Sequence, residues 1–300
     1  MIIGIHGNEE GANGMKILLD VIRGAVIGLA NIIPGVSGGT MMVSMGIYDT
    51  LIYCITHLFS QFRKSVMTLL PYVVGMVAAI VGLSFVIDWA FASYPLPTNT
   101  LFIGLILGGL PAIVRQLKGS RMNVGGGVLF ILFFALIIVL QLVQKENVTV
   151  IQLSVLEVVK LLFIGMLASA TMVIPGVSGS MILKLIGYYE PVIASVKGLT
   201  VSLAAGEWGA VLTNVGILLP FGIGIVVGIF AIAKLIEVLL ARHKLLTYCA
   251  ILGLVVASPV AILMGTDMSG AAWPVILCSL VTFALGYFVA MKLGGEPRKD

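Results

Sequence analysis

The chain has 300 residues, of which 60% are hydrophobic and only 10% are charged, and its formal net charge is +4. A soluble domain carries about 25% charged residues, so this composition excludes an ordinary water-facing surface and leaves most of the exterior to face lipid. The apolar segments run nearly from end to end, which also excludes a sizeable soluble domain.

The first 14 residues are polar and rich in glycine, and we expect them to form a loose N-terminal tail. A membrane span needs about 20 apolar residues. Ten apolar runs of spanning or near-spanning length follow the tail, at about 16–33, 40–59, 66–92, 99–117, 125–143, 155–173, 181–200, 211–241, 245–264 and 272–292. The sequence therefore predicts an all-α, polytopic membrane protein that ends in a short cytoplasmic tail over 294–300.

The second five runs repeat the first five. Ile-Pro-Gly-Val-Ser-Gly occurs at 33–38 and again at 174–179 without a mismatch. Further collinear pairs are Gly24 with Gly165, Gly46-Ile47-Tyr48-Asp49 with Gly187-Tyr188-Tyr189-Glu190, Pro71 with Pro220, and Pro111 with Pro259. These matches predict a duplication, with repeat 1 over 15–147 and repeat 2 over 148–293.

The two repeats are expected to have inverted topology. Each contains five segments, and an odd number of crossings turns the second repeat over relative to the first. Lys and Arg gather at the same set of connections, near 16–23, 63–64, 115–121, 242–244 and 292–299. The positive-inside rule then places both termini in the cytoplasm, in agreement with the parity of the segments.

Each repeat carries a helix break at its Pro-Gly-Val-Ser-Gly loop. Pro34 and Pro175 cannot lie inside an intact helix without removing a hydrogen bond. We expect helices to restart at about Gly38 and Gly179. The segments beside each loop form either a re-entrant hairpin or full crossings, and about three full transmembrane helices complete each repeat.

A helix that restarts inside a membrane presents unpaired N–H groups and the positive end of its dipole, which suits an anion and above all a phosphate. Inverted repeats with broken helices are also the plan of many secondary transporters. The candidate phosphate-binding residues of the loops are Gly35, Val36, Ser37, Gly38, Gly39, Thr40, Gly176, Val177, Ser178, Gly179 and Ser180.

Glycine pairs at small-xxx-small spacing have a second interpretation, as close helix packing. For Gly104 with Gly108 and for Gly224 with Gly228 we favour packing. For the loops we favour function, because a costly break is present in both repeats.

Ionisable residues within apolar segments are costly and therefore informative. Arg23 either pairs with phosphate or extends to the cytoplasmic interface, and Lys184 is interpreted as a cation for the bound anion. Asp49 and Glu190, with Tyr48 and Tyr189 before them, either accept coupling protons, or pair with these cations, or cap or anchor helix ends. Residues closer to segment ends are interpreted as interfacial: Arg115, Glu157, Lys234 and Glu237.

Nothing in the sequence indicates a catalytic or metal site. The three histidines are scattered, no Ser-His-acid set or Walker loop occurs, and Cys54, Cys249 and Cys278 lie in apolar stretches at no metal-like spacing. We therefore expect no enzyme activity, no cofactor, no metal and no nucleic-acid partner.

The loop residues carry a family resemblance. Asn31 to Thr40 with Gly46-Ile47-Tyr48-Asp49, and Pro175 to Ser180 with Gly187 to Pro191, resemble the two signatures of the bacterial polyprenyl-phosphate transporters. The resemblance extends from about Met15 to Leu293 and adds Asn31 to the candidate phosphate-binding residues. The family often has an acid where Asn31 stands and an apolar residue where Lys184 stands.

The resemblance implies a bacterial inner-membrane translocase that carries undecaprenyl phosphate from the outer to the inner leaflet for reuse in cell-wall synthesis. The inverted repeats predict alternating access, and our hypothesis for ion coupling is that inward proton movement through Asp49 or Glu190 drives the cycle. Its partners would be this lipid, the phospholipid bilayer and, in a homo-oligomer, a second copy of the chain. A small-anion channel or exporter could use the same helix ends. A lipid-phosphate enzyme is disfavoured by the missing catalytic residues, and a purely structural subunit by the doubled loop.

Overall fold

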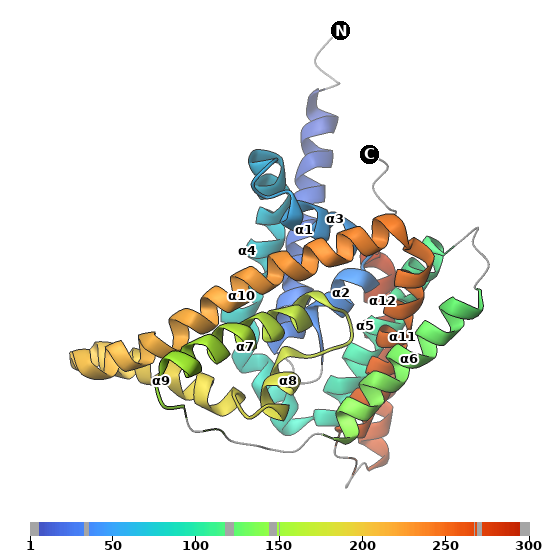
Figure 1. Ribbon diagram of the computed structural model, residues 1–300. Coiled ribbons are helices and arrows are strands. Elements are labelled where there is room, and N and C mark those ends of the chain that lie inside the picture. The colour runs from blue at the N-terminus through green and yellow to red at the C-terminus, as the bar shows by residue number, and fades with distance from the viewer. Residues whose placement is uncertain are drawn as a thin grey trace. The chain divides into compact units, whose positions relative to one another are not determined.

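The computed structural model describes residues 6–32, 36–117, 123–143, 149, 151–266, 268 and 272–294. Every element in these ranges is a helix (Figure 1). In chain order they are α1 (His6–Ile32), α2 (Gly38–Ser44), α3 (Tyr48–Thr56), α4 (Phe62–Ser93), α5 (Pro95–Gln116), α6 (Val124–Leu142), α7 (Val155–Val173), α8 (Gly179–Leu185), α9 (Tyr189–Ala205), α10 (Trp208–Arg242), α11 (Lys244–Met264) and α12 (Trp273–Leu293). Seven of these described helices are long and apolar enough to cross a membrane: α4, α5, α6, α7, α10, α11 and α12. The predicted all-α, multi-pass membrane protein is confirmed.

The order of helices from α1 to α6 recurs from α7 to α12. The short helices α2 and α8 both have seven residues, and both follow a loop that carries the repeated motif. Pro71 and Pro220 lie inside α4 and α10, and Pro111 and Pro259 lie inside α5 and α11. This order is what a duplication predicts, and the inversion of the second repeat stays a prediction.

The N-terminal stretch differs from the expected loose tail. α1 begins at His6, so residues 6–14 form a helix that continues into the first apolar run. Polarity alone is therefore a poor sign of irregular structure here.

The apolar runs expected at 40–59 and 181–200 are each interrupted by a further break, in addition to the loop that precedes the run. Gly46 and Gly187 adopt φ angles of 68° and 81°, the left-handed region that ends a helix and that other residues rarely enter. α2 and α8 therefore stop after seven residues, a length of about 10 Å. A crossing needs about 30 Å, so neither short helix spans the membrane by itself.

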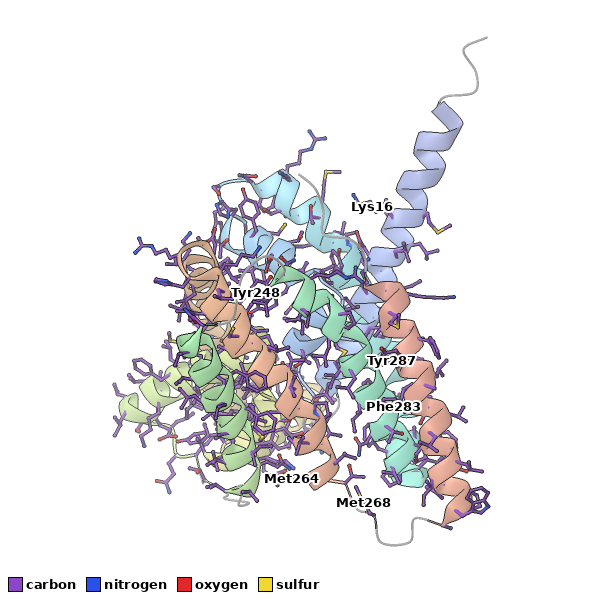
Figure 2. All side chains as sticks on the ribbon, turned by 90° about the vertical axis from the view of Figure 1, so that its right-hand side faces the viewer. Lys16, Tyr248, Met264, Met268, Phe283 and Tyr287 are labelled. Atoms are coloured by element: carbon purple, nitrogen blue, oxygen red, sulfur yellow. The ribbon has the colours of Figure 1, made fainter. Side chains whose placement is uncertain are left out.

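The chain forms two compact units. Unit 1 contains residues 1–121 and 262–300, and unit 2 contains residues 122–261. Within unit 1, α1 packs against α4 and α12 packs against α5. Gly104 and Gly108 of α5 face the backbone of Phe283 and Tyr287 of α12, which Figure 2 labels. A side chain at either glycine would collide with that backbone, so packing is confirmed for this pair.

Unit 2 has a helix pair that is built in the same way. α7 packs against α10, with Gly165 facing the backbone of Phe221 and Gly224 facing that of Leu162. Gly228 continues the same contact, which confirms the packing interpretation of the Gly224–Gly228 pair. In unit 1, Gly24 of α1 faces the backbone of Tyr72 in the same manner. The aligned glycines Gly24 and Gly165 thus have one role in both units.

The last helix of each predicted repeat packs in the unit formed mainly by the other repeat. α6 belongs to unit 2, where Ile137 lies in an apolar cluster with Met181 of α8 and Leu254 of α11. α12 belongs to unit 1, where it covers α5. The boundaries of the packing units therefore differ from the predicted repeat boundary near residue 147. That boundary marks where the sequence duplication begins again, and it does not separate the packing units.

Candidate functional site

The described part of the first loop is a short extended segment that leads into α2. Ser37 precedes the helix with extended backbone angles of −111° and 132°. Its carbonyl accepts hydrogen bonds from the Thr40 amide at 3.0 Å and the Met41 amide at 3.4 Å. Ser37 and Thr40 are 4% and 1% exposed. The expected helix restart at Gly38 is confirmed, while Gly35 lies outside the described residues.

Asn31 connects the end of α1 to this restart. The Gly38 amide donates a hydrogen bond to Asn31 Oδ1 at 3.3 Å, so the first N–H of α2 already has an acceptor within the chain. Val36, Gly38 and Gly39 are buried beside it. Asn31 therefore holds the loop in place, a role that is independent of whether it touches a ligand.

The second loop has the same form. Ser178 precedes α8 with backbone angles of −89° and 131°, and its carbonyl accepts from the Ile182 amide at 3.2 Å. Its hydroxyl oxygen lies 2.9 Å from that of Ser180. The restart expected at about Gly179 is confirmed. Two hydroxyl groups thus face each other across the first turn of α8.

The two residues before Ser178 are held in place by their contacts with neighbouring helices. Gly176 has a φ of 83°, and a side chain there would meet the backbone of Leu254 in α11. Val177 is buried in the apolar cluster that Leu254 and Ile137 share. A larger residue at Gly176 would be strained and would also collide, so this glycine is required by the fold.

The candidate cation Arg23 lies in a buried cluster of unit 1. Its Nη1 contacts Asp20 Oδ1 at 3.0 Å, and its Nε and Nη2 donate to the Leu293 carbonyl at 3.1 and 2.9 Å. The Tyr72 hydroxyl donates to the same Asp20 oxygen at 2.6 Å. We call Asp20, Arg23 and Tyr72 the Asp20 cluster. It ties α1 to α4 and to the last turn of α12.

The other candidate cation, Lys184, lies in the last turn of α8. Its ammonium group lies 5.3 Å from the centre of the Tyr189 ring at the start of α9, a cation–π distance. A cation in this turn also interacts favourably with the carbonyl end of the helix dipole. In this structure Lys184 therefore links α8 to α9.

The aligned acids occupy equivalent places. Asp49 lies in the first turn of α3 and Glu190 in the first turn of α9, where both stabilise a helix start. Asp49 is half-buried and Glu190 is exposed. Of the tyrosines before them, Tyr48 is buried and Tyr189 is half-buried.

The sequence patterns do not reveal a second polar cluster, which lies in unit 2. Glu157 is expected at an interface, but it is 8% exposed. Its Oε1 accepts a hydrogen bond from the Tyr188 hydroxyl at 2.5 Å, and its Oε2 lies 3.1 Å from Lys160 Nζ. We call Glu157, Lys160 and Tyr188 the Glu157 cluster. The signal in both clusters is an acid three residues before a base, the spacing at which helical side chains meet.

Comparison with known proteins finds relatives of this chain by sequence. A family profile described as "Undecaprenyl phosphate translocase-like" matches residues 27–275. A protein named polyprenyl-phosphate transporter from Staphylococcus aureus is 32% identical over 288 residues, which cover 92% of this chain and 95% of the relative. One with the same name from Vibrio cholerae is 28% identical over 260 residues, covering 81% and 77%. No solved structure gives a significant match.

The profile spans most of the chain and includes both loops. The chain therefore belongs to the undecaprenyl phosphate translocase-like family of multi-pass membrane proteins.

Proposed function

We propose that this chain moves undecaprenyl phosphate across the bacterial cytoplasmic membrane, from the outer to the inner leaflet, by alternating access and with proton coupling. The observation that carries the proposal is the pair of matching loops, each leading buried hydroxyl residues into a seven-residue helix. The relatives' printed names support a prenyl phosphate as the substrate.

The chemistry of the loops suits a phosphate that must leave water. An isolated anion in the bilayer core is very costly, so a carrier has to replace its hydration with fixed donors. The hydroxyls of Ser37, Thr40, Ser178 and Ser180 and the amides around them are such donors. The prenyl tail would remain in lipid while the phosphate moves through the protein.

Of the two candidate cations, Lys184 requires the smaller rearrangement to reach a phosphate. Its ammonium is held by one aromatic ring, and it lies on the short helix that follows the loop. Arg23 would have to leave both Asp20 and the Leu293 carbonyl. We therefore assign the counter-ion role to Lys184 and a structural role to Arg23.

The orientation follows from the charges of the connections. The basic residues near 63–64, 115–121 and 242–244 would lie on the cytoplasmic side together with both termini. In this orientation the phosphate is released toward the enzymes that reuse it.

The test is transport by the full chain in liposomes that contain labelled undecaprenyl phosphate. We expect the label to move between leaflets, and we expect Lys184→Ala to slow this movement by about tenfold, the loss of one charge-assisted contact. Lys197→Ala is the matched control, because Lys197 is an exposed lysine of the neighbouring helix α9.

Three results would refute the proposal. Wild-type liposomes that leave the label in its original leaflet would refute translocation. Equal competition by inorganic phosphate would favour the anion channel, and release of inorganic phosphate from the lipid would favour an enzyme.

A further inference from the structure

Glu157 is a buried carboxylate inside a helix that is apolar enough to cross the membrane. It lies in the first turn of α7, where its amide donates to the hydroxyl of Ser154. Its two oxygens have different partners, the Tyr188 hydroxyl on one and the Lys160 ammonium on the other. A negative charge at such a place is costly and depends on both partners.

In the part of the chain that the structure describes, the helices around Glu157 bring no second cation to it. α10 passes α7 between Gly216 and Gly224, a stretch without a charged residue. On α8, Lys184 is directed to the Tyr189 ring, and on α9, Glu190 and Lys197 are exposed. Among the described residues that pack against this end of α7, the titratable groups at Glu157 are therefore Lys160 and Tyr188.

Tyr188 connects Glu157 to the helix that follows the second loop. The Tyr188 amide donates to the Leu183 carbonyl at 2.9 Å, and the Gly187 amide donates to the Lys184 carbonyl at 3.0 Å, which closes α8. The Tyr188 ring is buried in an apolar cluster with Leu161 of α7 and Phe221 of α10. The hydrogen bond to Glu157 thus anchors the end of α8 to α7.

The Asp20 cluster of unit 1, by comparison, has a base that keeps its charge and its partners. Its base is an arginine, which stays charged, and it is also bound to the Leu293 carbonyl. The side chains of Arg23 and Asp20 are 15% and 10% exposed. In the Glu157 cluster the lysine side chain is 50% exposed, so the Lys160 side of the carboxylate is open to the surroundings of the protein.

We propose that Glu157 is the proton-binding site that couples transport to a pH gradient, and that Tyr188 transmits its protonation to α8. The proposal rests on the proposed function and assigns the coupling to a group other than Asp49 or Glu190. A proton that arrives on the Lys160 side adds to the carboxylate and forms a neutral carboxylic acid. Lys160 then loses its ion pair, and Tyr188 loses its charged acceptor, which frees the end of α8 to move with the loop.

Proton binding can be measured without transport. In infrared difference spectra of the purified full-length protein, a carboxylic-acid band should rise as the pH falls. We expect Glu157→Gln to remove a band that Glu190→Gln and Asp49→Asn retain. A spectrum of Glu157→Gln with every wild-type band present would overturn the assignment.

Coupling is measured in liposomes with labelled undecaprenyl phosphate and an imposed pH difference at zero membrane potential. With one proton per cycle, one pH unit shifts the distribution of the lipid between leaflets by about tenfold. We expect Glu157→Gln to lose this shift and Glu190→Gln to keep it. Tyr188→Phe removes only the hydroxyl, so it should keep the infrared band of Glu157 and lose the shift.

The outcomes separate the two proposals. Wild-type protein that moves the lipid but ignores the pH difference overturns the role of Glu157 and leaves translocation itself intact. A shift that persists in Glu157→Gln does the same. Wild-type protein that does not move the lipid at all refutes the proposed function. If Glu157→Gln fails to fold, Tyr188→Phe decides, because a full pH response in that variant contradicts transmission through the hydroxyl.

Discussion

The two units share a scaffold but differ in their polar clusters. Aligned glycines, Gly24 and Gly165, bring a long helix against its neighbour in each unit, and aligned loops lead into helices of equal length. The Asp20 cluster and the Glu157 cluster, by contrast, stand at different positions of the repeat and use different residue types. The glycines and loops that the two units share are required for packing. The polar clusters differ, so they are where the two units can act differently.

A second shared feature joins consecutive helices. The Thr98 hydroxyl donates to the carbonyls of Ala90 and Tyr94, across the junction of α4 and α5. The Thr247 hydroxyl donates in the same way to the carbonyls of Leu239 and His243, across the junction of α10 and α11. The comparison therefore predicts equal effects of substitution at shared positions and unequal effects at the clusters.

The largest equal effect is expected at the packing glycines. Gly24→Val and Gly165→Val each force a side chain against a neighbouring helix backbone, and we expect either to cost more than about 3 kcal/mol and to abolish most of the folded protein. The measurement is the yield of monodisperse protein in detergent. Gly82→Ala is the control, because a side chain there meets open space. A loss in only one of the two variants would break the comparison.

The largest unequal effect is expected at the two bases. Arg23→Gln leaves the buried Asp20 charge without its ion pair, which should cost about 3 kcal/mol. Lys160→Gln removes a half-exposed partner, and a proton on Glu157 would remove the unpaired charge, so this substitution should cost less than about 1 kcal/mol. Thermal unfolding in detergent measures both. Equal costs would mean that the two clusters contribute equally to stability.

The scaffold is predictable from the sequence, and the clusters are much less so. Proline in apolar sequence identifies both loops, and the Gly104–Gly108 and Gly224–Gly228 pairs mark helix contacts correctly. The helix ends at Gly46 and Gly187 are not predicted, although glycine is a signal for a helix end and the acid three residues later is a signal for a helix start. Asp20 is overlooked and Glu157 is placed at the interface, because helix periodicity does not reveal which distant tyrosine will reach a carboxylate.

The exchange of α6 and α12 between units is also beyond sequence reasoning. Both helices are apolar on all sides, so their sequences do not select a partner. The predicted phosphate residues near α2 and α8 stand at equivalent places of their loops, but their joint action on one ligand stays a prediction.

A smaller effect is expected at the second loop. Gly176→Ala places a side chain on a residue with φ of 83° and against the Leu254 backbone, and should cost about 2 kcal/mol. Gly206 also has a positive φ, 71°, but a side chain there meets open space, so Gly206→Ala should cost about half as much. Thermal unfolding of both variants tests whether contact with α11 adds to the backbone strain. Equal costs would show that it does not.

The smallest effect is expected at the helix junctions. Thr98→Val and Thr247→Val each remove one hydroxyl donor and should each cost about 1 kcal/mol. Thr200→Val is the control, because the Thr200 hydroxyl lies at an exposed position of α9. Unequal costs at Thr98 and Thr247 would show that the two junctions have the same hydrogen bonds but contribute differently to stability.

The central proposal is that the loop hydroxyls bind the phosphate of the lipid. The most direct test is the rate at which labelled undecaprenyl phosphate crosses liposomes that contain Ser37→Ala, Ser178→Ala, the double variant, or the control Ser195→Ala, whose buried hydroxyl donates to the Pro191 carbonyl outside the loops. A hydrogen bond to a charged group contributes about 1.5 kcal/mol or more, so each loop substitution should slow transport by about tenfold and the double variant further. A double variant that transports as fast as Ser195→Ala would contradict the account.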